Sequence, residues 1–236
     1  MAPTEHIVAS FDRDLEAIQA NIMRMGGLVE DAIVKSAQAL DTRDPELARR
    51  VREDDAAVDA LDAQINEEAA RIIAQRQPIA SDLRTILSVF RISSNLERIG
   101  DYAKNIAKRS EAIMDHPPPN GSGASLRRMA RQVELMLKDV LDAYIQRDAD
   151  MATDVRERDL EVDQMYAALF REYLTFMMED PRNITTCMHL HFMAKNIERM
   201  GDHTTSIAEQ VIYLVTGEMP DEERPKQEQI PQAGSL

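Results

Sequence analysis

Acidic residues spaced four apart recur in this sequence and are its clearest candidates for chemistry. One pair is Glu97 and Asp101, and the other is Glu198 and Asp202, each inside the motif Asn-x-Glu-Arg-x-Gly-Asp. Residues four apart lie on the same face of a helix, so each pair places two carboxylates side by side. Carboxylate oxygens are the ligands that hard cations prefer in proteins, so each pair is a candidate metal site.

A second set of acids recurs upstream of each pair, within the motif Arg-Glu-x-Asp-x-x-Val-Asp. These acids border an apolar stripe, so we expect them to face a neighbouring helix. Together the two sets give four carboxylates in each half of the chain, which suits Mg²⁺, Mn²⁺ or iron. The candidate metal ligands are Asp55, Asp59, Glu97, Asp101, Asp159, Asp163, Glu198 and Asp202.

A solvated helix face is the alternative explanation for these acids, because exposed charges beside arginines are common. Repetition in both halves favours a role beyond solubility. Lys104 and Lys108 follow the first pair and offset its repulsion, whereas the turns after Asp202 bring His203 and Glu209. The second pair is therefore the better candidate for binding a cation.

Catalytic machinery is not visible in the sequence. No serine, cysteine or histidine arrangement typical of a nucleophile is recognisable, and Glu-x-x-His, the motif of di-iron bundles, is missing. Glycine-rich nucleotide loops are also missing. His203 is expected to be an ordinary surface histidine. We therefore predict no catalytic residues.

The charge of the chain restricts its partners. The 236 residues hold 28 Lys and Arg against 42 Asp and Glu, a net charge of −14. Such a surface repels nucleic acids and anionic lipid headgroups. No apolar stretch reaches the ~18 residues of a membrane span, and Cys187, the single cysteine, allows no intrachain disulfide. We expect a soluble, cytoplasmic protein without direct membrane insertion.

Helical periodicity and internal repetition define the expected architecture. The first motif pair is offset by 101 residues (198 − 97) and the upstream motif by 104 (156 − 52), so the halves are duplicates. We predict an all-α protein of two tandem, duplicated antiparallel three-helix bundles. The expected helices span 5–40, 44–76, 79–115, 125–146, 148–178 and 182–217. The bundles occupy 5–115 and 125–217, separated by a Pro/Gly linker at 116–124 and followed by a flexible acidic tail at 218–236.

Two local signals refine this prediction. Asp44-Pro45 and Asp180-Pro181 have the pattern of a helix N-cap followed by proline. Glycine within a helix is unfavourable, so its recurrence in the acidic motif indicates a close approach of two helices.

Several motifs taken together resemble the PhoU family. They are Met25-Gly26-Gly27-Leu28-Val29-Glu30, the stretch from Arg71 to Arg84, Met177-Met178-Glu179-Asp180 and the two Glu-Arg-x-Gly-Asp motifs. The resemblance covers about residues 5–217. It departs from the pattern once, because Asp82-Leu83-Arg84 in the first half corresponds to Asn183-Ile184-Thr185 in the second.

The resemblance implies a function as well as a fold. PhoU-like proteins are duplicated three-helix bundles, often homodimers, that act in the cytoplasm at the inner face of the membrane. They work with the ATPase of the phosphate ABC transporter and with the PhoR sensor kinase, and they help repress the phosphate-starvation response when phosphate is plentiful. The acidic motifs of the family bind metals, and these motifs correspond to the eight acids above. The candidate ions are Mg, Mn, Fe or Zn.

Two other functions compete with this one. The first is a helical-bundle enzyme that uses carboxylate-bridged metals, against which the missing Glu-x-x-His motif argues. The second is a structural bundle whose acids only maintain solubility. A non-catalytic regulator of phosphate uptake and signalling is the expectation that the combined motifs favour.

Overall fold

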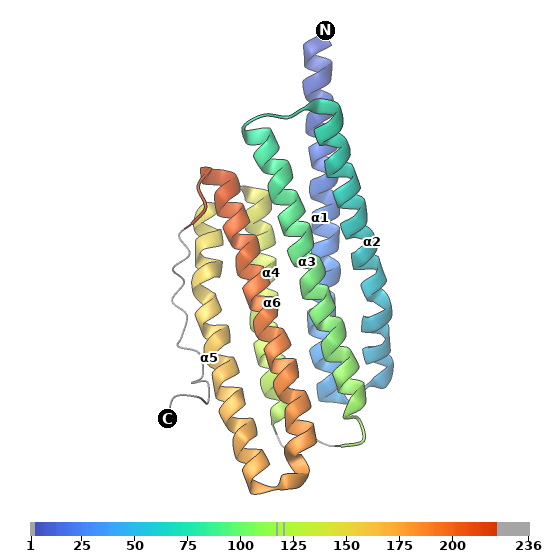
Figure 1. The fold of residues 1–236 in the computed structure, drawn as a ribbon, viewed down its shortest axis with the longest axis vertical. Coiled ribbons are helices and arrows are strands. Elements are labelled where there is room, and N and C mark those ends of the chain that lie inside the picture. Colours follow the sequence, from blue (N-terminus) through green and yellow to red (C-terminus); the bar gives the residue numbers. More distant parts are fainter. Residues whose placement is uncertain (1–2, 117, 120, 221–236) are drawn as a thin grey trace.

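Six long helices account for the fold of the computed structural model, which describes residues 3–116, 118–119 and 121–220 (Figure 1). A short 3-10 turn, Pro181–Asn183, precedes the last helix, and the described ranges contain no strand. The helices are α1 (Pro3–Thr42), α2 (Pro45–Arg76), α3 (Ser81–Ala112), α4 (Ser122–Gln146), α5 (Ala149–Glu179) and α6 (Ile184–Thr216).

The helices form two antiparallel three-helix bundles that lie side by side (Figure 1). In the first bundle α1, α2 and α3 pack on one another, and in the second α4, α5 and α6 do the same. The bundles meet along two seams, α1 against α4 and α3 against α6. One apolar cluster extends through both bundles, so the seam excludes water as the bundle interiors do. The predicted all-α class and duplicated bundles are confirmed.

The turn between the first two helices of each bundle is built identically. Arg43 and Arg147 adopt left-handed conformations, with φ of 52° and 55°. The residue that follows, Asp44 or Asp148, donates its backbone N–H at 3.0 Å to the carbonyl five residues earlier. This hydrogen bond closes the preceding helix. Asp44 and Asp148 then cap the following helix through Oδ1. The Asp44 cap was predicted from its proline, whereas Asp148 lacks that signal.

Helix boundaries differ from the predictions by up to three residues, and two of the differences have a visible local cause. Asp180 accepts the N–H of Arg182 at 3.0 Å, but it caps the 3-10 turn, and α6 begins only at Ile184. Helix α4 begins at Ser122, directly after Gly121, which has a φ of 88°. A Cβ on Gly123 would lie 3.1 Å from Asp41 Oδ1. Gly123 thus allows α4 to pack against the end of α1, although its composition suggested a linker.

Two further sequence predictions concern the C-terminal tail and the lack of a membrane span. The expected flexible tail at 218–236 lies almost entirely outside them, because they end at residue 220. Within residues 3–116, 118–119 and 121–220, none of the helices combines the length and apolar character that crossing a bilayer requires.

Candidate functional site

The recurring glycines bring the acidic helices together in both bundles. A Cβ added to Gly100 of α3 would lie 3.3 Å from Val58 Cγ1 and 3.6 Å from Asp55 Oδ1 on α2. The second bundle is tighter, because a Cβ on Gly201 of α6 would lie 3.0 Å from Asp159 Oδ1. Both glycines are buried in these contacts. The predicted close approach of two helices is confirmed at both positions.

This approach places the acids of each bundle along one groove between two helices. In the first bundle Asp55 is buried and Asp59 is exposed on α2, while Glu97 and Asp101 are half-buried on α3. In the second bundle Asp159 is buried, and Asp163, Glu198 and Asp202 are half-buried between α5 and α6. We call these two sites the first and second acidic grooves.

A lysine neutralises part of the first acidic groove. Lys104 Nζ lies 2.5 Å from Asp55 Oδ2, whose side chain is only 4% exposed, and 3.8 Å from Asp101 Oδ1. The hydrogen bond to Asp55 raises the pKa of Lys104. This lysine is therefore a protonated counter-charge built into the groove.

The remaining acids of the first acidic groove repel one another. Partial loss of hydration beside α3, followed by the neighbouring Asp55, raises the pKa of Asp59, although its side chain is exposed. Burial and the adjacent Asp101 likewise raise the pKa of Glu97, although Arg98 lowers it. Smaller effects come from the facing helix, because Asp101 on α3 raises the pKa of Asp59 and Asp59 on α2 raises that of Glu97. An added cation would therefore stabilise the ionised groove.

The second acidic groove holds a carboxylate that is incompletely satisfied. Lys195 Nζ donates to Glu198 Oε1 at 2.6 Å, but Oε2 is buried and accepts no hydrogen bond from the described residues. Burial raises the pKa of Glu198, Lys195 lowers it, and Asp202 and Asp163 raise it further. A buried acceptor beside two more carboxylates matches the chemistry of a hard cation site.

Duplication did not preserve the lysine. Thr205 stands where the repeat offset of 101 residues would place Lys104 (205 − 104). The Thr205 hydroxyl is buried and donates at 2.9 Å to the backbone carbonyl of Gly201. The second acidic groove therefore has no lysine at the position equivalent to Lys104, although Lys195 pairs with Glu198 there. The buried Oε2 of Glu198, which accepts no hydrogen bond from the described residues, is the feature that favours this groove as a metal site.

The side chains do not form a finished metal site in their present rotamers. No group of three or more histidine, cysteine or acidic residues in the described ranges is close enough together to hold an ion. The eight predicted metal ligands lie along the two grooves, four in each, but not close enough together to coordinate one ion. Their role as ligands stays a prediction.

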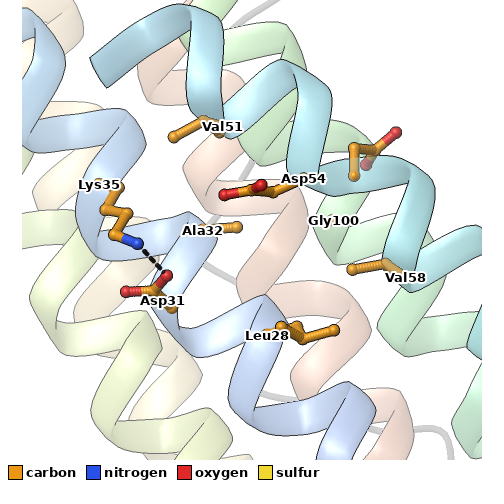
Figure 2. A pocket seen from close by; sticks show the side chains of 9 residues that line it. Leu28, Asp31, Ala32, Lys35, Val51, Asp54, Val58 and Gly100 are labelled. Carbon is orange, nitrogen blue, oxygen red and sulfur yellow. Dashed lines mark ion pairs between the residues drawn. The ribbon is translucent and has the colours of Figure 1, made fainter. Parts of the chain in front are cut away.

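A small cavity lies beside the first acidic groove (Figure 2). It has a volume of about 30 Å³ and lies between α1, α2 and α3, with Gly100 and Asp55 in its wall. Figure 2 shows Asp54 on α2 pointing toward α1, where Lys35 pairs with Asp31 at 2.5 Å. This volume has room for about one water molecule, which excludes an organic ligand from the cavity.

One polar contact at the seam between the bundles was not predicted. His203 Nδ1 of α6 lies 2.7 Å from Asn95 Oδ1 of α3, and the His203 ring packs 5.6 Å from that of Tyr102. His203 is half-buried, so the expectation of an ordinary surface histidine is wrong. Tyr102 and His203 occupy equivalent positions in the repeat (203 − 102 = 101). Equivalent residues of two repeats can meet where the equivalent helices pack on each other, as α3 and α6 do. The repeat offset was therefore the signal that could have predicted this contact.

Comparison with known proteins explains the duplication. The PhoU domain model matches the chain twice, over residues 22–110 and 126–211. The chain belongs to the PhoU family. Each match covers the helices of one bundle, so the PhoU domain is the repeated unit that the motif offsets indicated.

The similarity to individual PhoU proteins extends over nearly the whole chain. The phosphate-specific transport system accessory protein PhoU homolog of Rhizobium meliloti (strain 1021) is 47% identical over 231 residues, 98% of each chain. The homolog from Caulobacter vibrioides (strain NA1000 / CB15N) is 46% identical over 94% of this chain and 97% of its own. The crystal structure of PhoU from Pseudomonas aeruginosa superposes with a TM-score of 0.85 at 40% identity, covering 88% of this chain and 100% of that one.

A more distant PhoU structure has the same fold. The crystal structure of the phosphate transport system regulatory protein PhoU from Streptococcus pneumoniae gives a TM-score of 0.82 at 30% identity. It covers 89% of this chain and 99% of that one. The paired bundles are thus shared by PhoU proteins across this range of sequence identity.

Proposed function

We propose that this chain is a non-catalytic regulator of phosphate uptake and signalling, acting as an accessory of a phosphate-specific transport system. The observation that carries the proposal is the near full-length similarity to PhoU relatives that bear that name. Because both bundles and both acidic motifs lie within the matched regions, the similarity includes the candidate site as well as the fold.

The regulator couples two partners, the ATPase of the phosphate ABC transporter and a PhoR-type histidine kinase. When phosphate is plentiful, this coupling holds the phosphate-starvation response off. A cytoplasmic homodimer that reaches the inner membrane only through these partners fits a chain whose net charge is −14. Half-buried carboxylates along the grooves suit docking against basic patches of partner proteins.

Metal binding in the acidic grooves is part of the proposal. Asp159, Asp163, Glu198 and Asp202 would hold an Mg, Mn, Fe or Zn ion in the second acidic groove, and the buried Oε2 of Glu198 supports this assignment. In the first acidic groove, Lys104 competes with an ion for Asp55 and Asp101. A bound ion would neutralise the clustered carboxylates and change the charge that a partner meets.

A pull-down from membranes tests the partner assignment. The tagged chain would be incubated with membranes of cells grown in high and in low phosphate, and bound proteins would be identified by mass spectrometry. We expect the transporter ATPase and the kinase to be retained, at levels that differ between the two conditions. Recovery of neither protein under either condition would contradict the proposal.

A further inference from the structure

An arginine-lined cleft lies at the other seam of the molecule, away from the acidic grooves. It lies between α1 and α4 and has a volume of about 310 Å³. No acidic residue lines it. The lining residues are Val34 and Ala37 from α1 and Arg127, Arg128, Ala130 and Arg131 from α4.

The charge of this cleft is opposite to that of the chain as a whole. Residues 122–133 contain three arginines and no acid, although the chain carries a net charge of −14. Arg128 donates at 2.8 Å to Ser125 Oγ, and among the described residues it forms no ion pair. One guanidinium at the cleft is therefore available to an anion from solution.

The other two guanidiniums form ion pairs that are exposed on the arginine side. Arg127 pairs with Asp41 at 2.6 Å, and Arg131 pairs with Glu134. The arginine side chains remain 56% and 60% exposed. The paired carboxylates are less exposed, Asp41 at 24% and Glu134 at 11%. Each guanidinium has several N–H donors, so a phosphate can bind the solvent-facing side of both arginines while the carboxylates stay in place.

The wall of the cleft is apolar. Val34 is 39% exposed, a large hydrophobic side chain open to solvent, and Ala37 and Ala130 beside it are almost fully buried. The volume exceeds what inorganic phosphate fills and reaches the lower range of small-molecule pockets. An occupant that uses the whole cleft therefore has an apolar or aromatic part as well as an anionic one.

We propose that the α1–α4 cleft binds an organic phosphate. Its phosphate groups contact Arg127, Arg128 and Arg131, and its apolar part packs on Val34. Guanidinium forks match phosphate oxygens in geometry and charge. The inference goes beyond the regulatory function proposed above and is independent of the acidic grooves.

Isothermal titration calorimetry of the full chain with ATP, pyrophosphate and adenosine tests this site. We expect saturable binding of ATP, weaker binding of pyrophosphate and no saturable binding of adenosine. Arg128→Gln should weaken ATP binding about tenfold, since a hydrogen bond to a charged group is lost. Arg171→Gln, an exposed arginine on α5, is the matched control and should leave binding unchanged. Val34→Glu, a second variant, should abolish binding by placing a carboxylate on the wall.

Three results would overturn the proposal. The first is the lack of saturable ATP binding. The second is ATP binding that neither Arg128→Gln nor Val34→Glu changes in variants whose circular dichroism matches the wild type. The third is pyrophosphate binding as tightly as ATP, which would show that the apolar wall contributes nothing to ligand binding. The titration uses no transporter or kinase, so its failure is distinct from failure of the membrane pull-down.

Discussion

Lys104 on α3 donates to Asp55 on α2 across 2.5 Å, and so supplies the counter-charge for a carboxylate that is only 4% exposed. The second bundle keeps the buried aspartate, Asp159, but has Thr205 in place of the lysine. The two acidic grooves therefore have the same number of acids but place a lysine differently: Lys104 pairs with the buried aspartate in the first, and Lys195 pairs with Glu198 in the second. The predictions about the first acidic groove depend on this difference.

Replacing Lys104 by methionine should destabilise the first bundle. The substitution keeps a long side chain but leaves the Asp55 carboxylate buried without its ammonium partner. Since Lys104 itself is 41% exposed, we expect a moderate loss of about 1–2 kcal/mol in the free energy of unfolding. Urea unfolding measures it, with Lys108→Met, at an exposed position, as the control. Equal stability of the two variants would contradict the role assigned to Lys104.

Replacing Lys104 by threonine gives the first acidic groove the residue that the second has at the equivalent position. Without the ammonium, a divalent cation no longer competes with Lys104 for Asp55 and Asp101. We expect Lys104→Thr to bind more Mn²⁺ per chain than the wild type in equilibrium dialysis. Mn²⁺ should also raise the Tm of the variant more than that of the wild type. A variant that binds no more Mn²⁺ than the wild type would show that Lys104 does not compete with metal.

Gly201 should tolerate alanine less well than an open helical glycine does. Alanine gains about 1 kcal/mol of helix propensity over glycine, but a Cβ on Gly201 would lie 3.0 Å from the buried Asp159 carboxylate. Gly27 is the matched control, because a Cβ there meets nothing within 4 Å. We expect Gly201→Ala to be about 1–2 kcal/mol less stable than Gly27→Ala, measured by urea unfolding. Equal effects would mean that the helices can separate at no cost.

The stability cost of Glu198 should depend on pH. Burial raises the pKa of Glu198 above its usual value, so the folded chain binds this proton more tightly than the unfolded chain. Below about pH 4 the group is protonated in both states and imposes no cost. As the pH rises through the folded pKa, the buried carboxylate ionises, and the fold loses the stability that the protonated form of Glu198 gave it.

The comparison of Glu198→Gln with the wild type measures this effect. Relative to the wild type, the variant should become more stable between pH 4 and pH 7, and the gain should be small because Lys195 already compensates part of the charge. Glu157→Gln, on the exposed face of α5, should show no such change. A relative stability that falls over the same pH range would reverse the sign assigned to Glu198.

Much of the fold could be predicted because its signals are local. The acidic motifs revealed the duplication, and Asp44 marked the start of α2 through an ordinary capping interaction. Gly123 misled because glycine is typical of both linkers and tight packing. Only the contact of Gly123 with Asp41 distinguishes the two roles.

The candidate site was predicted less completely than the fold. Helical periodicity places Glu97 and Asp101 on one face, but it does not say which residues of another helix that face meets. The Lys104–Asp55 pair and the His203–Asn95 contact both depend on how whole helices pack. The same is true of the arginine cleft, because its walls come from helices of different bundles.

A deletion strain assayed for phosphate-responsive gene expression tests the central claim most directly. The strain would carry a reporter and be complemented with the wild-type chain, with Glu198→Ala/Asp202→Ala, or with Glu157→Ala/Glu161→Ala, an exposed acid pair of the same spacing. We predict reporter expression in high phosphate after deletion, repression by the wild type and by the exposed-pair variant, and loss of repression in Glu198→Ala/Asp202→Ala. Unchanged reporter expression after deletion would contradict the proposed regulatory function.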